Sequence, residues 1–186
     1  MEAPATPATD PRKTDDQVIR YPDPRLRRKA KPVTEVTPEL VKRAEGLFPL
    51  MYEEEGIGLA APQVGWNVRL FVVNLSGNPG DELIILNPEI VEESGGTWKA
   101  EEGCLSVPKI YGKVIRNKRI RMIGLDLEGE EIEVEAEGMV ARCLLHEYDH
   151  LDGILFIDRL SAVKKQAIKR KLRALEEDYA EEHGEH

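Results

Sequence analysis

The sequence predicts an α+β fold in which mixed or antiparallel sheets pack around one central helix, with a further helix at the C-terminus. Three observations predict it: a helix-type pattern comes first, several strand-type segments follow, and two helix-type segments end the chain. The 186 residues, 41% hydrophobic and 33% charged, fit one domain with a hydrophobic core. We expect this domain to span residues 18–186, with the C-terminal helix over 160–182.

Residues 1–17 are rich in Pro, Ala, Thr and Asp and have no apolar period, so we expect a disordered tail there. This segment has no apolar core of a signal peptide, and its acidic residues are atypical of a transit peptide. The chain has no run of about 18 apolar residues, as a membrane span would need. The net charge of -9 disfavours broad nucleic-acid binding. We therefore expect a cytoplasmic protein that does not bind a membrane.

The ordered part begins at residues 18–24, where two prolines indicate an extended stretch and a turn. The first helix begins after Thr37, because a hydroxyl N-cap precedes Pro38 at the first helical position. Apolar residues recur at helical spacing over 40–52, which predicts one buried face. Gly56 then ends the helix.

Strand-type segments occupy the middle of the chain. Two short apolar runs predict buried strands, and two alternating segments around a Glu-Gly turn predict a hairpin. An apolar segment then predicts the central helix, and a serine N-cap begins the last one. In order, these elements cover 70–75, 83–88, 119–127, 131–137, 139–151 and 161–182.

The central helix carries the sequence His146-Glu147-Tyr148-Asp149-His150, an HExxH motif. Residues four apart lie on the same face of a helix, with Cβ atoms about 5–6 Å apart, so both imidazoles can bind one ion. The alternative is a surface helix with two solvated histidines. The largely apolar segment before His146 favours the metal site, because buried histidines need partners.

A catalytic metal site of this kind needs a third protein ligand. Cys143 and His150 are seven residues apart, about 10 Å along a helix axis at 1.5 Å per residue. That separation excludes Cys143 as a ligand alongside His146, and we expect it to be a small buried residue nearby. Cys104, in a short extended piece between Gly103 and Pro108, is the better thiolate donor. Its alternative is an inert core cysteine.

Three segments resemble the signature motifs of peptide deformylases, in the order and separation of that family. They are Gly56–Gln63 (GIGLAAPQ), Glu102–Ser106 (EGCLS) and His146–His150, followed by Leu-Asp-Gly. The early segment Tyr21–Leu26 also fits, so the resemblance covers the chain from about residue 18 to the final helix. One difference is Leu145, where the family usually has Gln. An apolar residue there removes a possible polar contact behind the site.

The resemblance implies that Cys104, His146 and His150 bind one divalent metal ion. The family's ion is Fe(II), for which Ni, Co or Zn can substitute, whereas chemistry alone would favour zinc. The implied reaction is hydrolysis of the N-formyl group, with Glu147 as the general base. The implied oxyanion donors are the Gln63 side-chain amide and the Leu105 backbone N–H. Gln63 has an alternative role as a loop-anchoring amide.

The implied substrates are nascent peptides that begin with formyl-methionine. By resemblance, their main chain pairs with the backbone of Ile57 and Gly58 as an added strand. The methionine side chain needs an apolar pocket, for which Met139, Cys143 and the aliphatic stem of Arg142 are candidates. For Met139, ordinary core packing is the alternative. We expect Tyr111 to contact the next substrate residues.

The last helix concentrates basic residues, which most often form a solvated face. The resemblance suggests a contact with ribosomal RNA near the peptide exit, although acidic residues follow at 176–185. The basic residues are Lys164, Lys165, Lys169, Arg170, Lys171 and Arg173.

Two functions of other classes compete with this assignment. A zincin-type endopeptidase would take its third ligand from downstream of the motif, and Cys104 would then be dispensable for metal binding. A protein-binding module would instead hold a structural metal with a closed fourth position. An inactive relative of the deformylases is a further alternative, against which the intact Gln63, Cys104 and Glu147 argue.

Overall fold

The computed structural model describes residues 10–184, and within them three α-helices and five strands occur in the predicted order. Short 3-10 helices, η1 to η4, lie between these elements and cover Pro24–Arg27, Ala61–Val64, Pro79–Asp81 and Phe156–Arg159. The helices are α1 (Pro38–Glu53), α2 (Gly138–Leu151) and α3 (Ala162–His183). The strands are β1 (Gly58–Ala60), β2 (Leu70–Val73), β3 (Leu83–Cys104), β4 (Val107–Leu125) and β5 (Glu131–Glu137).

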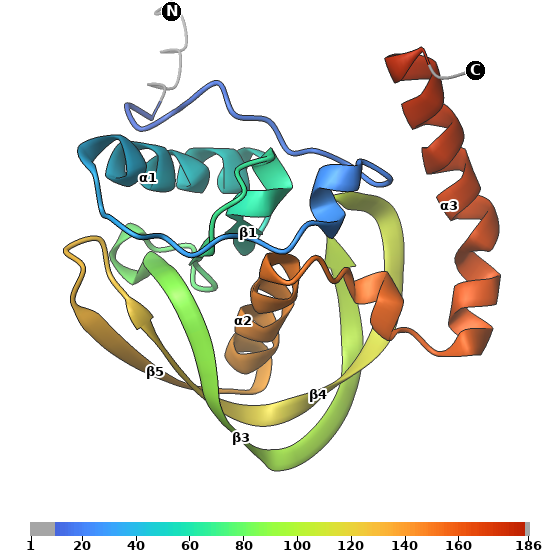
Figure 1. Ribbon diagram of the computed structural model, residues 1–186. Helices are drawn as coiled ribbons and strands as arrows, with labels where there is room; N and C mark the ends of the chain where they lie inside the picture. Colours follow the sequence, from blue (N-terminus) through green and yellow to red (C-terminus); the bar gives the residue numbers. More distant parts are fainter. Residues whose placement is uncertain (1–9, 185–186) are drawn as a thin grey trace, which may run out of the picture.

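The strands form one sheet in the order β1-β2-β3-β4-β5, and every neighbouring pair is antiparallel. Figure 1 shows that this sheet curls around α2, while α1 lies outside the curl. One apolar cluster, including Phe71, Met122 and Leu144, joins α2 to the sheet. A second cluster, including Leu47 and Val72, joins α1 to β1 and β2. The predicted α+β class, with an antiparallel sheet and a C-terminal helix, is therefore confirmed.

The predicted helix starts are also confirmed. The Thr37 hydroxyl accepts a hydrogen bond from the Leu40 N–H at 3.2 Å, and the Ser161 hydroxyl accepts one from Lys164 at 3.3 Å. The predicted hairpin is formed by β4 and β5, and Gly129 in its turn adopts a φ of 81°. These local signals succeeded because a cap or a turn depends on only a few neighbouring residues.

The β3–β4 hairpin is much longer than the sequence pattern predicted. β3 continues past residue 88 to Cys104, and β4 begins at Val107 rather than near 119. Residues 89–104 are rich in Glu and Gly and do not alternate regularly, so the strand signal is weak. The pairing is interrupted by register shifts, one of them between Ser94 and Thr97. Such irregularities bend a strand, which allows the hairpin to curve around α2.

Some residues of the expected disordered tail, within 10–17, contact the folded domain; residues 1–9 lie outside the described residues. Arg12 forms an ion pair with Glu82 at 2.6 Å, and Asp16 pairs with Arg43 of α1 at 2.7 Å. Thr14 lies against Gly46, where a Cβ atom would meet its methyl group at 2.4 Å. Arg12, Thr14 and Asp16 thus have partners in the folded domain.

Helix α3 stands at the side of the molecule, and its C-terminal end points away from the sheet (Figure 1). Ile168 is its buried residue, packed in a cluster that includes Val114 and Leu160. The Tyr21 hydroxyl also bonds to Glu176 of this helix at 2.6 Å, which ties the N-terminal segment to α3. Across residues 10–184, we find no helix with the length and apolar character that crossing a membrane requires.

Candidate metal centre

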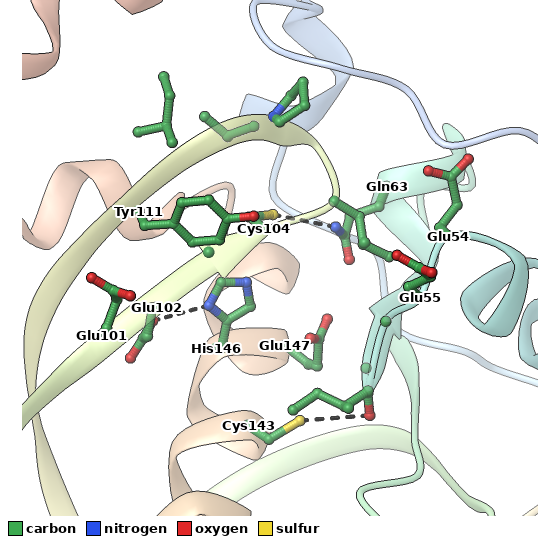
Figure 2. A pocket seen from close by; sticks show the side chains of 18 of the residues that line it. Glu54, Glu55, Gln63, Glu101, Glu102, Cys104, Tyr111, Cys143, His146 and Glu147 are labelled. Atoms are coloured by element: carbon green, nitrogen blue, oxygen red, sulfur yellow. Dashed lines mark hydrogen bonds and ion pairs between the residues drawn. The ribbon is translucent and has the colours of Figure 1, made fainter. Parts of the chain in front are cut away.

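The side chains of Cys104, His146 and His150 converge, and one ligand atom from each lies within 4.8 Å of the others. Cys104 ends β3, whereas both histidines project from α2 (Figure 2 shows Cys104 beside His146). The Cys104 Sγ lies 3.3 Å from His150 Nε2. The structure therefore brings together the three residues predicted as metal ligands.

Glu102 and Cys104 lie two residues apart on β3, so their side chains approach α2 from the same face of the strand. Glu102 Oε2 accepts a hydrogen bond from His146 Nδ1 at 3.0 Å, as Figure 2 shows. This bond holds the imidazole ring in place and leaves Nε2 of His146 available for a metal ion. Glu102 belongs to one of the three sequence motifs, but no role was predicted for it.

Two arginines fix the Glu102 carboxylate. Arg116 donates to it at 2.7 and 2.9 Å, and Arg142 donates at 2.6 Å. Burial alone would raise the pKa of Glu102, but the hydrogen bonds from Arg116 and His146 hold it well below the usual range. Glu102 is therefore a carboxylate, the form that can orient a metal-binding histidine.

The charge network continues behind the site. Arg116, 5% exposed, also donates to Asp149 at 2.7 Å, and Asp149 accepts a further hydrogen bond from Arg159 at 2.5 Å. No role was predicted for Arg116 from the sequence. Every second residue of a strand lies on the same face, and Gly112, Val114 and Arg116 are all buried on one face of β4. This alternation is the pattern that could have indicated a buried arginine.

Glu147 is the second carboxylate of the site. It is 4% exposed, and its Oε2 has no hydrogen-bond partner within the described part of the chain. Burial raises the pKa of Glu147 to about 7, with a contribution from the negative charge of Glu102. A Cβ atom on Gly58 would meet Glu147 Oε1 at 2.5 Å, so the absence of a side chain at Gly58 makes room for this carboxyl group.

Gln63 lies beside the sulfur. Its Oε1 accepts a hydrogen bond from the Ala60 N–H at 2.8 Å, so the loop-anchoring role is present. Its Nε2 lies 3.5 Å from Cys104 Sγ and 3.2 Å from Ser106 Oγ, which directs the amide donor toward the metal ligands. Leu105 follows Cys104 in the β3–β4 turn, and its side chain packs with the α1 cluster.

A cavity of about 510 Å³ opens beside this centre and is lined by all six residues predicted to bind substrate. Three of them form an open rim, because Ile57 is 46%, Met139 49% and Tyr111 58% exposed. The core-packing alternative for Met139 is therefore wrong. Cys143 is buried, and its Sγ lies 3.8 Å from the Ile57 carbonyl oxygen.

Arg142 also lines the cavity but is only 2% exposed. Its guanidinium donates a hydrogen bond to Glu102. It also donates to the backbone carbonyl oxygens of Val114 and Trp98, in both cases at 3.0 Å. It also lies over the Trp98 ring, 4.5 Å from the centroid. With the charged end held in this way, the aliphatic stem is the part available to the cavity.

Leu145, the position that differs from the family pattern, is 7% exposed and packs in the apolar cluster between α2 and the sheet. Phe71, Val73 and Ile85 belong to the same cluster. The side chain thus lies in an apolar environment, which suits leucine without a polar partner.

The donor set fits a single divalent metal ion. One thiol and two imidazoles are a usual set for such ions. Burial lowers the pKa of His150 well below its usual range, which keeps the ring in the neutral form that binds metals. Acids downstream of the motif are engaged elsewhere: Asp152 pairs with Arg69 and Asp158 pairs with Arg27. Among residues 10–184, the group that could hold an ion with the two histidines contains Cys104 and no downstream acid, so the zincin arrangement is not formed there.

The curled sheet, the helix that carries the HExxH sequence and the Cys-His-His group are features of a metal-dependent hydrolase. A family model described as "Polypeptide deformylase" matches residues 16–166 of the chain. The chain therefore belongs to the peptide deformylase family.

Individual relatives agree with this assignment. A peptide deformylase of Acinetobacter baumannii (strain SDF) is 44% identical over 158 residues, which cover 85% of this chain and 90% of that protein. A crystal structure of the plant peptide deformylase PDF1B has a TM-score of 0.89 and 40% identity, covering 92% of this chain and 95% of that one. A peptide deformylase structure from Legionella pneumophila has a TM-score of 0.82 and 41% identity, with 89% and 97% covered.

Proposed function

We propose that this chain hydrolyses the N-formyl group of nascent peptides that begin with formyl-methionine, with release of formate. One observation carries the proposal: a sulfur and two imidazoles converge beside a buried carboxyl group, Glu147, at the end of an open cavity. Cys104, His146 and His150 would hold the ion. A divalent metal ion in such a site supplies Lewis acidity, which lowers the pKa of water and polarises a carbonyl group.

In the proposed reaction, Glu147 accepts a proton from the attacking water and later passes it to the departing amine. A pKa of about 7 suits both transfers, because the carboxyl group can hold and release a proton near neutral pH. Attack on the formyl carbon places negative charge on the formyl oxygen. The Gln63 amide and the Leu105 backbone N–H are the proposed donors to that oxygen.

The substrate main chain would pair with the backbone of Ile57 and Gly58. The position of β1 at the edge of the sheet supports this pairing. β1 pairs with β2 along one side, so its other side is the edge of the sheet to which a peptide can add as a strand. The methionine side chain would lie against Met139, the stem of Arg142 and Cys143, and Tyr111 would contact the following residues. All of these residues line the same cavity.

We further propose that the resident ion is Fe(II), with Zn, Ni or Co as substitutes, and that the enzyme works in the cytoplasm, where formylated nascent chains arise. The thiolate and imidazole donors support any of these ions. Metal analysis after anaerobic purification distinguishes them, since an air-stable zinc protein with full activity would exclude Fe(II) as a requirement.

Helix α3 is proposed to contact ribosomal RNA through its six basic residues (164, 165, 169, 170, 171 and 173). Most of this helix is exposed, which leaves these side chains accessible. If the contact is electrostatic, ribosome affinity falls steeply with added salt. Binding that persists after all six cations are neutralised would exclude this role.

Formate release from formyl-Met-Ala-Ser tests the proposed reaction directly. We expect turnover by the metal-loaded protein and none by the metal-free protein. An internally cleavable, unformylated peptide serves as the control. Its cleavage, without formate release from the formylated peptide, would favour an endopeptidase instead.

A further inference from the structure

A second cavity, of about 660 Å³, lies next to the first one. Its walls come from the N-terminal segment 13–20, from the end of α1 and from Tyr179, Glu182 and His183 of α3. Arg20 and Glu54 line both cavities, and Arg20 Nη2 lies 3.6 Å from Glu54 Oε2. This exposed ion pair therefore marks the boundary between the two cavities.

The route from the metal centre to this boundary follows one wall. Residues 54–58 all line the first cavity, with Gly58 beside Glu147 at one end and Glu54 at the other. Figure 2 shows Glu54 and Glu55 together on the side of Gln63, opposite Glu101 and Glu102. This wall leads from the metal centre to Glu54, one of the residues that line both cavities.

The second cavity carries an excess of negative charge. Three basic side chains line it: Lys13 pairs with Glu53 at 2.6 Å, Arg25 with Asp23 at 2.7 Å, and Arg20 with Glu54. The six acidic side chains are Asp15, Asp16, Asp23, Glu53, Glu54 and Glu182. Within residues 10–184, Asp15 and Glu182 have no ion-pair partner. A positively charged segment is the complementary occupant.

We propose that the second cavity binds the downstream part of the substrate peptide and favours basic residues there; this inference rests on the proposed deformylase activity. The peptide would enter past the Arg20–Glu54 pair after its first residues occupy the cavity at the metal centre. Ten extended residues span about 33–36 Å, so substrates of this length extend beyond the first cavity. The N-terminal segment and α3 thereby contribute to substrate selection.

Three peptides test the proposal on the full-length, metal-loaded protein. The first is formyl-Met-Ala-Ser, and the other two extend it to ten residues, with three lysines or three glutamates near the C-terminal end. We expect kcat/KM to favour the lysine peptide by about two- to fivefold, the range for exposed ion pairs. The double variant Asp15→Asn/Glu182→Gln should lose this preference and keep the activity on the tripeptide.

The matched control is Glu128→Gln/Glu181→Gln, which removes the same number of charges from exposed positions outside both cavities. It should keep the lysine preference. A ten-residue lysine peptide with a photoreactive benzoylphenylalanine at its eighth position should crosslink to residues 13–20 or 179–183. Normal turnover of the tripeptide with equal kcat/KM for both long peptides, or crosslinks only elsewhere, overturns the inference. No turnover of the tripeptide would remove the proposed function itself.

Discussion

The Glu102 carboxylate lies 3.0 Å from His146 Nδ1 and is itself held by Arg116 and Arg142. A strand residue thus orients a helix residue at the metal centre. Since Cys104 lies two residues further along the same strand, one short segment of β3 supplies both a metal ligand and the support of another ligand. This arrangement makes metal affinity sensitive to a residue that does not touch the ion.

Replacing Glu102 with Gln should weaken metal binding by about 10- to 100-fold, the usual effect of losing such a supporting group. Competition with a chelator measures the affinity, and circular dichroism verifies that the variant is folded. Glu101→Gln is the matched control, because Glu101 is exposed and directly precedes Glu102 on β3. Equal metal affinity in both variants would show that the Glu102–His146 bond is unimportant.

Glu147→Gln should bind metal normally but lose about 10²- to 10⁴-fold in kcat, because the amide cannot accept the proton from water. Formate release and metal content measured on the same preparation separate the two effects. A Gln variant with full activity would refute the assignment of Glu147 as the general base.

Gly58→Ala should lower kcat by about 100-fold, since the new methyl group would displace the Glu147 carboxyl group. Gly80→Ala is a suitable control: a Cβ atom there meets nothing within 4 Å. If Gly58→Ala instead raised KM alone, Gly58 would act through substrate pairing and not through Glu147.

Leu145→Gln should lower the free energy of unfolding by about 1–3 kcal/mol, because it places an amide in an apolar cluster. Leu145→Met, which preserves the apolar character, should lower the free energy of unfolding by less than about 1.5 kcal/mol. Urea denaturation of both variants measures the difference. A stabilised Gln variant with tighter metal binding would reveal a polar partner for this position.

The sequence predicted the elements whose signals are local: the capped helices, the turn at Gly129 and the HExxH helix. Helical spacing excluded Cys143 and made Cys104 the better thiolate donor. The resemblance to peptide deformylases implied that Cys104 and the two histidines form one site. The length of the β3–β4 hairpin was missed, since Glu- and Gly-rich residues pair there through backbone hydrogen bonds that leave little side-chain pattern.

The charge network was missed for a different reason. Arg116 and Asp149 are far apart in the sequence, and only the folded hairpin brings the arginine against α2. Burial of such charges depends on partners that no local pattern reveals. The contacts of residues 10–17 with α1 were missed in the same way, because Arg12 and Asp16 pair with residues distant in the chain.

Cys104, His146 and His150 are proposed to bind one ion together, and metal analysis of two cysteine variants tests this binding. After anaerobic purification and dialysis, Cys143→Ala should retain one metal ion per chain, whereas Cys104→Ala should lose it together with formate release. A Cys104→Ala protein that keeps a full equivalent of metal would exclude Cys104 as a ligand.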